Sequence, residues 1–92
     1  MTKYHVEYTV KAIKQLRKLD QPTRKLIYAW IDKNLQNCEN PRVHGKGLTS
    51  DRSGQWRYRI GDYRVLADIQ DDKLLILVIE LGHRREIYDR KL

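Results

Sequence analysis

The stretch from residue 55 to residue 70 constrains the fold of this chain more than any other. In residues 55–60 aromatic or aliphatic side chains alternate with arginines. In residues 63–70 the alternation continues: Tyr63, Val65, Ala67 and Ile69 alternate with Arg64, Leu66, Asp68 and Gln70. A period of two predicts strands that bury one face. The Gly61-Asp62 pair between the two runs suits a two-residue hairpin turn. The sequence therefore predicts an antiparallel hairpin packed by one face on a core.

Other stretches predict the remaining elements. Residues 3–10 alternate and predict a first strand, while residues 10–19 and 27–38 carry apolar side chains at helical spacing. Pro22 suits the first turn of the second helix, and we expect Asn40-Pro41 to end that helix.

The C-terminal half adds a loop and a strand. Residues 42–54 contain three glycines and few apolar side chains, which predicts a long loop. Leu74 to Leu81 is apolar on both faces and predicts a central strand. The expected order is β-α-α-β-β-β. The fold class is then α+β, with a small, twisted, largely antiparallel four-stranded sheet and a helical hairpin packed on one face. We expect residues 1–92 to form a single domain.

The charge balance limits the partners. Nineteen Lys and Arg face twelve Asp and Glu, which gives a net charge of +7. Such a chain attracts polyanions, so nucleic acid, ribosome, acidic membrane and acidic protein are candidates. The N-terminus lacks the apolar core of a signal peptide, and no apolar run is long enough to span a membrane. We therefore expect a soluble cytoplasmic protein without a membrane partner.

Three arginines fall together on the outward face of the predicted hairpin. Arg57 and Arg59 share one face of their strand, about 7 Å apart. Around the Gly61-Asp62 turn, Arg59 falls opposite Arg64 on that same face. Like charges opposite one another destabilise a hairpin, and a bound polyanion would relieve the repulsion. Any one of these arginines is more often simply solvated, but the joint placement favours a binding surface.

The tail and the first helix carry further candidates. Gly82-His83-Arg84-Arg85 and Tyr88 follow the central strand. Taken singly, His83 and Tyr88 are more often surface or packing residues, and Lys11, Lys14 and Lys18 most simply form a solvated helix face. Cys38 is the only cysteine, and no phosphate-binding loop, HExxH motif or acidic cluster occurs. We therefore expect no metal and no cofactor.

Three ordered blocks, residues 40–48, 55–65 and 82–88, resemble the RelE branch of the RelE/ParE toxin superfamily, most clearly in WRYRIGDYRV and GHRREIY. The resemblance implies the toxin of a type II toxin–antitoxin system that cleaves mRNA in the ribosomal A site. It also implies the ribosome and mRNA as partners, and a RelB-like antitoxin in a possible hetero-oligomer.

The resemblance carries the family's active site onto Arg57, Arg59, Arg64, Arg84 and Tyr88. The best-known members have lysines at the first two positions, and the spacing from Gly82 to the tyrosine is shorter here. Cleavage without a metal requires loss of the 2′-hydroxyl proton, a counter-charge for the phosphate and protonation of the 5′-oxygen, leaving a 2′,3′-cyclic phosphate.

Arginine scarcely titrates, so we assign one proton transfer to His83 as a hypothesis. Tyr88 would assist the other transfer or stack on a base, and Arg84 would bind the scissile phosphate or polarise the leaving group. Further cations predicted to contact RNA or ribosome are Lys11, Lys14, Lys18, Lys46 and Arg85.

Three alternatives stay open. A ParE-like toxin has the same fold but inhibits DNA gyrase and has no nuclease activity, although it would not need the arginine cluster. A basic RNA-binding module without catalysis would use exposed aromatic pairs on its strands, which this sequence lacks. A folded but inactive toxin is the third.

Overall fold

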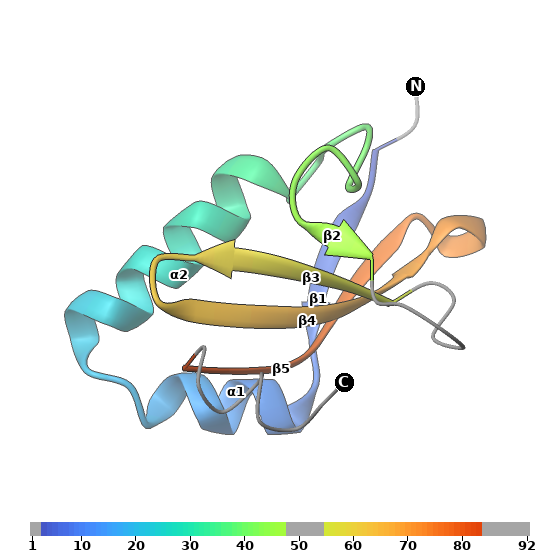
Figure 1. The fold of residues 1–92 in the computed structure, drawn as a ribbon. Helices are drawn as coiled ribbons and strands as arrows, with labels where there is room; N and C mark the ends of the chain where they lie inside the picture. Colours follow the sequence, from blue (N-terminus) through green and yellow to red (C-terminus); the bar gives the residue numbers. More distant parts are fainter. Residues whose placement is uncertain (1–2, 48–54, 84–92) are drawn as a thin grey trace.

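The computed structural model describes residues 3–47 and 55–83, which form a mixed sheet with two helices (Figure 1). The sheet has five strands in the order β1-β5-β4-β3-β2; β1 is parallel to β5, and every other neighbouring pair is antiparallel. The elements are β1 (His5–Tyr8), α1 (Val10–Arg17), α2 (Gln21–Asn34), β2 (Lys46–Gly47), β3 (Gln55–Ile60), β4 (Tyr63–Gln70), the 3₁₀ turn η1 (Asp71–Lys73) and β5 (Leu75–His83). The α+β class and the largely antiparallel sheet are confirmed.

The strand count is a correction to the sequence-based prediction. The composition of residues 42–54 predicts a loop, but Lys46–Gly47 pairs with β3 as a fifth strand at the sheet edge. Two residues are too few to show an alternating pattern, so no periodicity marks this strand in the sequence.

Helix α1 serves as the partner of an exposed strand edge. Strand β1 pairs with Leu75–Val78, which leaves the second half of β5 without a strand neighbour on that side among the residues that the structure describes. Thr9, the N-cap of α1, donates its hydroxyl to the Ile79 carbonyl oxygen (2.7 Å), and the Leu81 amide donates to Gln15 Oε1 (2.7 Å). Helix α1 therefore lies along β5 and covers an edge that could otherwise pair with another chain (Figure 1).

Helix α2 begins as predicted and ends early. Asp20 caps its N-terminus by accepting from the Thr23 amide, and Pro22 lies in the first turn. The helix ends at Asn34 instead of continuing to Asn40-Pro41, since Asn37 has a left-handed backbone (φ 64°) that a helix cannot contain.

The core lies between the two helices and one face of the sheet. Ala12 and Leu16 from α1 and Ile27 and Ile31 from α2 are fully buried against the inner side chains of β3, β4 and β5. The helical spacing predicts Val10 in this core, but Val10 is 69% exposed, because it follows the Thr9 cap on the outer side of the first turn. In the described part of the chain, neither helix is long and apolar enough to cross a membrane.

Candidate functional site

The hairpin register places two arginines directly opposite each other. Arg59 pairs with Arg64 across β3 and β4, and Ile60 pairs with Tyr63, so the predicted two-residue turn is confirmed. Directly opposed residues of an antiparallel pair project from the same face. That face is the one turned away from the helices, because Tyr58 and Val65, the alternating neighbours of these arginines, are buried in the core.

Strand β2 adds a second pair of like charges. Lys46 lies opposite Arg57 in the β2–β3 ladder, and Arg57 shares the open face with Arg59. Lys46, Arg57, Arg59 and Arg64, together with Gly45, line one cavity of about 260 Å³. We call it the cationic cavity. Four cationic side chains around one cavity attract anions, and guanidinium groups offer paired N–H donors to phosphate or carboxylate oxygens.

Arg64 forms the buried part of this cavity. It is 3% exposed and donates a hydrogen bond from its guanidinium to the carbonyl oxygen of Tyr63 (3.3 Å). Arg57 is half-buried and Arg59 is exposed, so the cavity runs from a buried cation to the surface. A charge held away from water acts on a ligand more strongly than a solvated one.

Gly45 brings the chain close enough to complete the cavity wall. Its backbone is left-handed (φ 79°), and a Cβ there would overlap the Arg57 carbonyl oxygen and lie 2.9 Å from Trp56 Nε1. Only glycine allows both this conformation and this approach. Gly45 therefore sets the position of the neighbouring Lys46 against β3.

Aromatic side chains of β3 anchor the segment before β2. The Trp56 indole donates to the His44 carbonyl oxygen (2.6 Å), and the Tyr58 hydroxyl donates to the Pro41 carbonyl oxygen (2.7 Å). Burial raises the pKa of Tyr58, so its hydroxyl stays protonated as a donor. The His44 ring packs edge-on to Trp30 of α2, with ring centroids 5.5 Å apart. The backbone of this segment is thus fixed to the sheet at two points.

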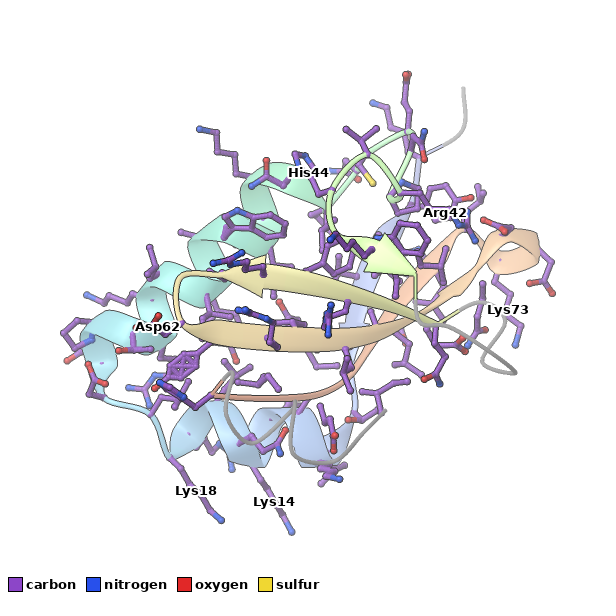
Figure 2. The ribbon with its side chains drawn as sticks, viewed as in Figure 1. Lys14, Lys18, Arg42, His44, Asp62 and Lys73 are labelled. Atoms are coloured by element: carbon purple, nitrogen blue, oxygen red, sulfur yellow. The ribbon has the colours of Figure 1, made fainter. Side chains whose placement is uncertain are left out.

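The Arg42 side chain, labelled in Figure 2, provides a third anchor through an ion pair. The Arg42 guanidinium binds both carboxylate oxygens of Asp71 at 3.0 Å and lies 5.9 Å from the centroid of the Trp56 ring. Tyr4 donates its hydroxyl to the same carboxylate (2.5 Å). Hydrogen bonds from Arg42 and Tyr4 hold the pKa of Asp71 below its usual range. Residues 41–45 are therefore held to η1 as well as to β3.

A carboxylate on the open face is neutralised by α1. Glu80 lies opposite Leu66, which in turn lies opposite Arg57, and Glu80 is 6% exposed. Its partner is Lys11, at 2.5 Å. Lys11, predicted to contact RNA, here binds a carboxylate of its own chain.

The structure places His83 away from the cavity, which corrects the expectation that its imidazole lies beside the arginines. His83 pairs with Tyr63, whereas Arg64 pairs with Gly82. Alternation therefore directs His83 to the opposite face from Arg64. Its ring packs edge-on against Tyr63, with ring centroids 5.7 Å apart, and it does not line the cationic cavity. The role of His83 as a proton carrier stays a prediction without support from its position.

The other predicted residues fall into two groups. Lys14 and Lys18 project together from α1 and line a groove with Val10, Lys11 and Gln15 (Figure 2). Arg84, Arg85 and Tyr88 lie outside the described residues. Within residues 3–47 and 55–83, no cluster of His, Cys, Asp and Glu is arranged to hold a metal ion.

The segment before β3 contributes more to the site than its sequence pattern predicts. The sequence predicts Lys46 as a contact to RNA or ribosome outside the arginine cluster, but its register opposite Arg57 makes it part of the cavity. The signal that could have shown this is Gly45-Lys46-Gly47 ahead of an alternating strand, because glycines mark a close backbone approach.

The fold and this cavity define a class: a small basic α+β protein that presents guanidinium groups on the open face of its sheet. A family profile described as the ParE toxin of type II toxin–antitoxin systems matches residues 6–88. Toxin RelE of Mycobacterium tuberculosis is 32% identical over 85 residues, which are 92% of this chain and 86% of the relative. Toxin RelG of the same organism is 29% identical over 87 residues, covering 95% and 98% of the two chains.

A solved structure agrees with these relatives. The RelBE2 toxin–antitoxin complex of M. tuberculosis contains a chain with a TM-score of 0.79 and 27% identity, covering 91% of this chain and 94% of that chain. The chain therefore belongs to the ParE toxin family of type II toxin–antitoxin systems. Within that family it is a RelE-type toxin.

Proposed function

We propose that this toxin is a ribosome-dependent endoribonuclease that cleaves mRNA in the ribosomal A site. The observation that carries the proposal is the cationic cavity, in which Arg57, Arg59 and Arg64 converge with Lys46. The cavity fits a phosphodiester, since guanidinium forks match phosphate oxygens and remain charged as negative charge builds up. The similarity to RelE-type toxins supports RNA as the polyanion.

The proposed reaction is attack by the 2′-hydroxyl on the adjacent phosphate, without a metal ion. Guanidinium groups would stabilise the charge on the non-bridging oxygens, a task that metal ions perform in other nucleases. The products are a 2′,3′-cyclic phosphate and a 5′-hydroxyl. Because the described cavity is lined mainly by guanidinium groups, which scarcely titrate, the ribosome would supply much of the rate by holding the mRNA near in-line geometry.

Primer extension on ribosomes programmed with a defined A-site codon tests this function. The expected result is a truncated product ending within that codon, formed only when protein and ribosome are both present. Intact mRNA under these conditions, with the protein folded, would contradict the proposal.

A second candidate is inhibition of DNA gyrase, which the ParE description of the matched family favours. The two candidates separate in a supercoiling assay with purified gyrase, in which a nuclease of this kind leaves supercoiling unchanged. Inhibition there, together with intact mRNA on ribosomes, would establish the gyrase alternative.

We further propose that a RelB-like antitoxin binds this chain, because the similar chain of known structure occurs in a toxin–antitoxin complex. An acidic or amphipathic segment of such a partner would complement the net charge of +7. Co-expression with a RelB-like antitoxin and co-purification of the two proteins tests this assignment.

A further inference from the structure

We propose that Lys46 is the catalytic proton donor to the 5′-oxygen that leaves during RNA cleavage. This assignment rests on the proposed function and deepens it. The observation behind it is that Lys46 is the one side chain lining the described cavity that is not a guanidinium but still carries a proton to give. The other charged members are Arg57, Arg59 and Arg64.

The chemistry of the two side-chain types divides the work. A guanidinium scarcely releases a proton, so the arginines can neutralise the phosphate but do not serve a leaving alkoxide. A lysine ammonium is charged at neutral pH and is therefore already in the acid form. Its three N–H donors on a flexible stem can follow the oxygen as the bond lengthens.

The position of Lys46 suits this role. Opposite residues of an antiparallel pair have Cβ atoms about 5 Å apart, and the side chains of Lys46 and Arg57 both line the cavity. Arg59 lies a further two residues along the same face, opposite the buried Arg64. A phosphate held by the arginines would thus have Lys46 on its β2 side, at the exposed rim of the cavity.

The structure also holds Lys46 in place through its neighbour. Gly45 lies against the Arg57 carbonyl and the Trp56 indole, and that indole donates to the His44 carbonyl oxygen (2.6 Å). Trp56 and Gly45 are positioning residues, because they act by fixing the backbone of Lys46. A proton donor gains most from such fixed geometry.

The proposed step balances in atoms and electrons. The O2′–P bond forms and the P–O5′ bond breaks, with the bonding pair passing to O5′. The proton of the 2′-hydroxyl passes to solvent water, and a proton from the Lys46 ammonium passes to O5′ to give the 5′-hydroxyl. Solvent then reprotonates the neutral amine.

A substrate with sulfur in place of the bridging 5′-oxygen tests the assignment, since a thiolate leaves without protonation. Cleavage of both mRNAs at the same mapped bond would be followed in single turnovers on programmed ribosomes. The variants are Lys46→Ala and Lys46→Arg, with Lys25→Ala, an exposed lysine of α2, as the matched control. Circular dichroism and thermal melts verify that each variant is folded.

On the oxygen substrate, both Lys46 variants should cleave about 10²–10⁴-fold more slowly than wild type, which is the usual contribution of a general acid. On the sulfur substrate, their cleavage rates should return to within a few-fold of wild type. Arg59→Ala should be slow on both substrates, because the phosphate charge is the same in each. If Lys46→Ala slows cleavage of both substrates equally, or slows neither, the assignment of Lys46 as proton donor is overturned. The proposed function is not affected by that result. Failure of the wild-type protein to cleave either mRNA overturns the proposed function, and this inference with it.

Discussion

At the scale of single residues, Arg64 has the strongest structural claim to a role in charge stabilisation. It is 3% exposed at the inner end of the cationic cavity, directly opposite Arg59. Because this guanidinium is held away from bulk water, its charge acts on a bound phosphate with little screening.

Arg64→Ala should reduce the single-turnover rate of A-site cleavage by about 10²–10³-fold, the effect of losing one preorganised charge. Arg64→Lys should recover part of the rate, because it restores the charge but not the guanidinium fork. The measurement is cleavage on programmed ribosomes with proteins verified as folded. An Arg64→Ala protein that cleaves at the wild-type rate would remove Arg64 from the site.

For His83, in contrast to Arg64, the structure predicts no large effect of substitution on the cleavage rate. Because its ring packs on Tyr63 on the face away from Arg64, His83→Gln should keep the cleavage rate within a few-fold of wild type. The same single-turnover assay measures this. A loss of 10²-fold or more would restore the hypothesis that His83 carries a proton and would require the end of β5 to rearrange on the ribosome.

At the scale of elements, the hairpin was predictable and the wall of the cavity was not. Alternation and the Gly61-Asp62 turn are enough to predict that Arg59 lies opposite Arg64, since a two-residue turn permits one register. Strand β2 left no periodic signal, and its position depends on long-range contacts of Trp56 and Tyr58. Contacts between residues far apart in sequence are set by tertiary packing, which local patterns do not encode.

Two glycines allow the wall of the cavity to be tested against a matched control. Gly45 and Gly61 both have a left-handed backbone, at φ 79° and 58°, but an added Cβ meets neighbours only at Gly45. Gly61→Ala should cost about 1–2 kcal/mol of unfolding free energy for its conformation alone. Gly45→Ala should cost more and should also slow cleavage, because it displaces Lys46. Denaturant unfolding and cleavage rates measure both; equal stability losses would contradict the close approach at Gly45.

The anchor formed by Arg42 and Asp71 predicts a pH dependence of stability. The pKa of Asp71 is lowered in the folded protein, so the carboxylate stabilises the fold above the usual aspartate pKa of about 3.9 and loses that effect as the pH falls further. Asp71→Asn should lower the unfolding free energy at neutral pH by about 0.2–1 kcal/mol, as for exposed ion pairs. The difference from wild type should shrink below about pH 4. Asp72→Asn, in the same turn, is the control; a constant difference at every pH would contradict the ion pair.

At the scale of the whole molecule, two properties could account for the proposed catalytic site: the net positive charge of the chain, or the arrangement of cationic side chains around one cavity. A net charge of +7 draws the protein to any polyanion, and this attraction requires no particular arrangement of side chains. The cavity instead requires four cations from three strands on one face. Cleavage at one defined bond requires the arranged cations of the cavity, because charges stabilise a transition state only when they are held at fixed positions around it.

The most direct measurement compares two double variants that remove the same charge. The double variant Arg59→Ala/Arg64→Ala removes two of the cationic side chains that line the cavity. The double variant Lys25→Ala/Lys33→Ala removes two exposed cationic side chains from α2, on the helical side of the sheet. Single-turnover cleavage of A-site mRNA should fall by more than about 10³-fold in the first protein and by no more than a few-fold in the second. Equal rates in the two folded proteins would contradict the claim that the converging guanidinium groups form the catalytic site.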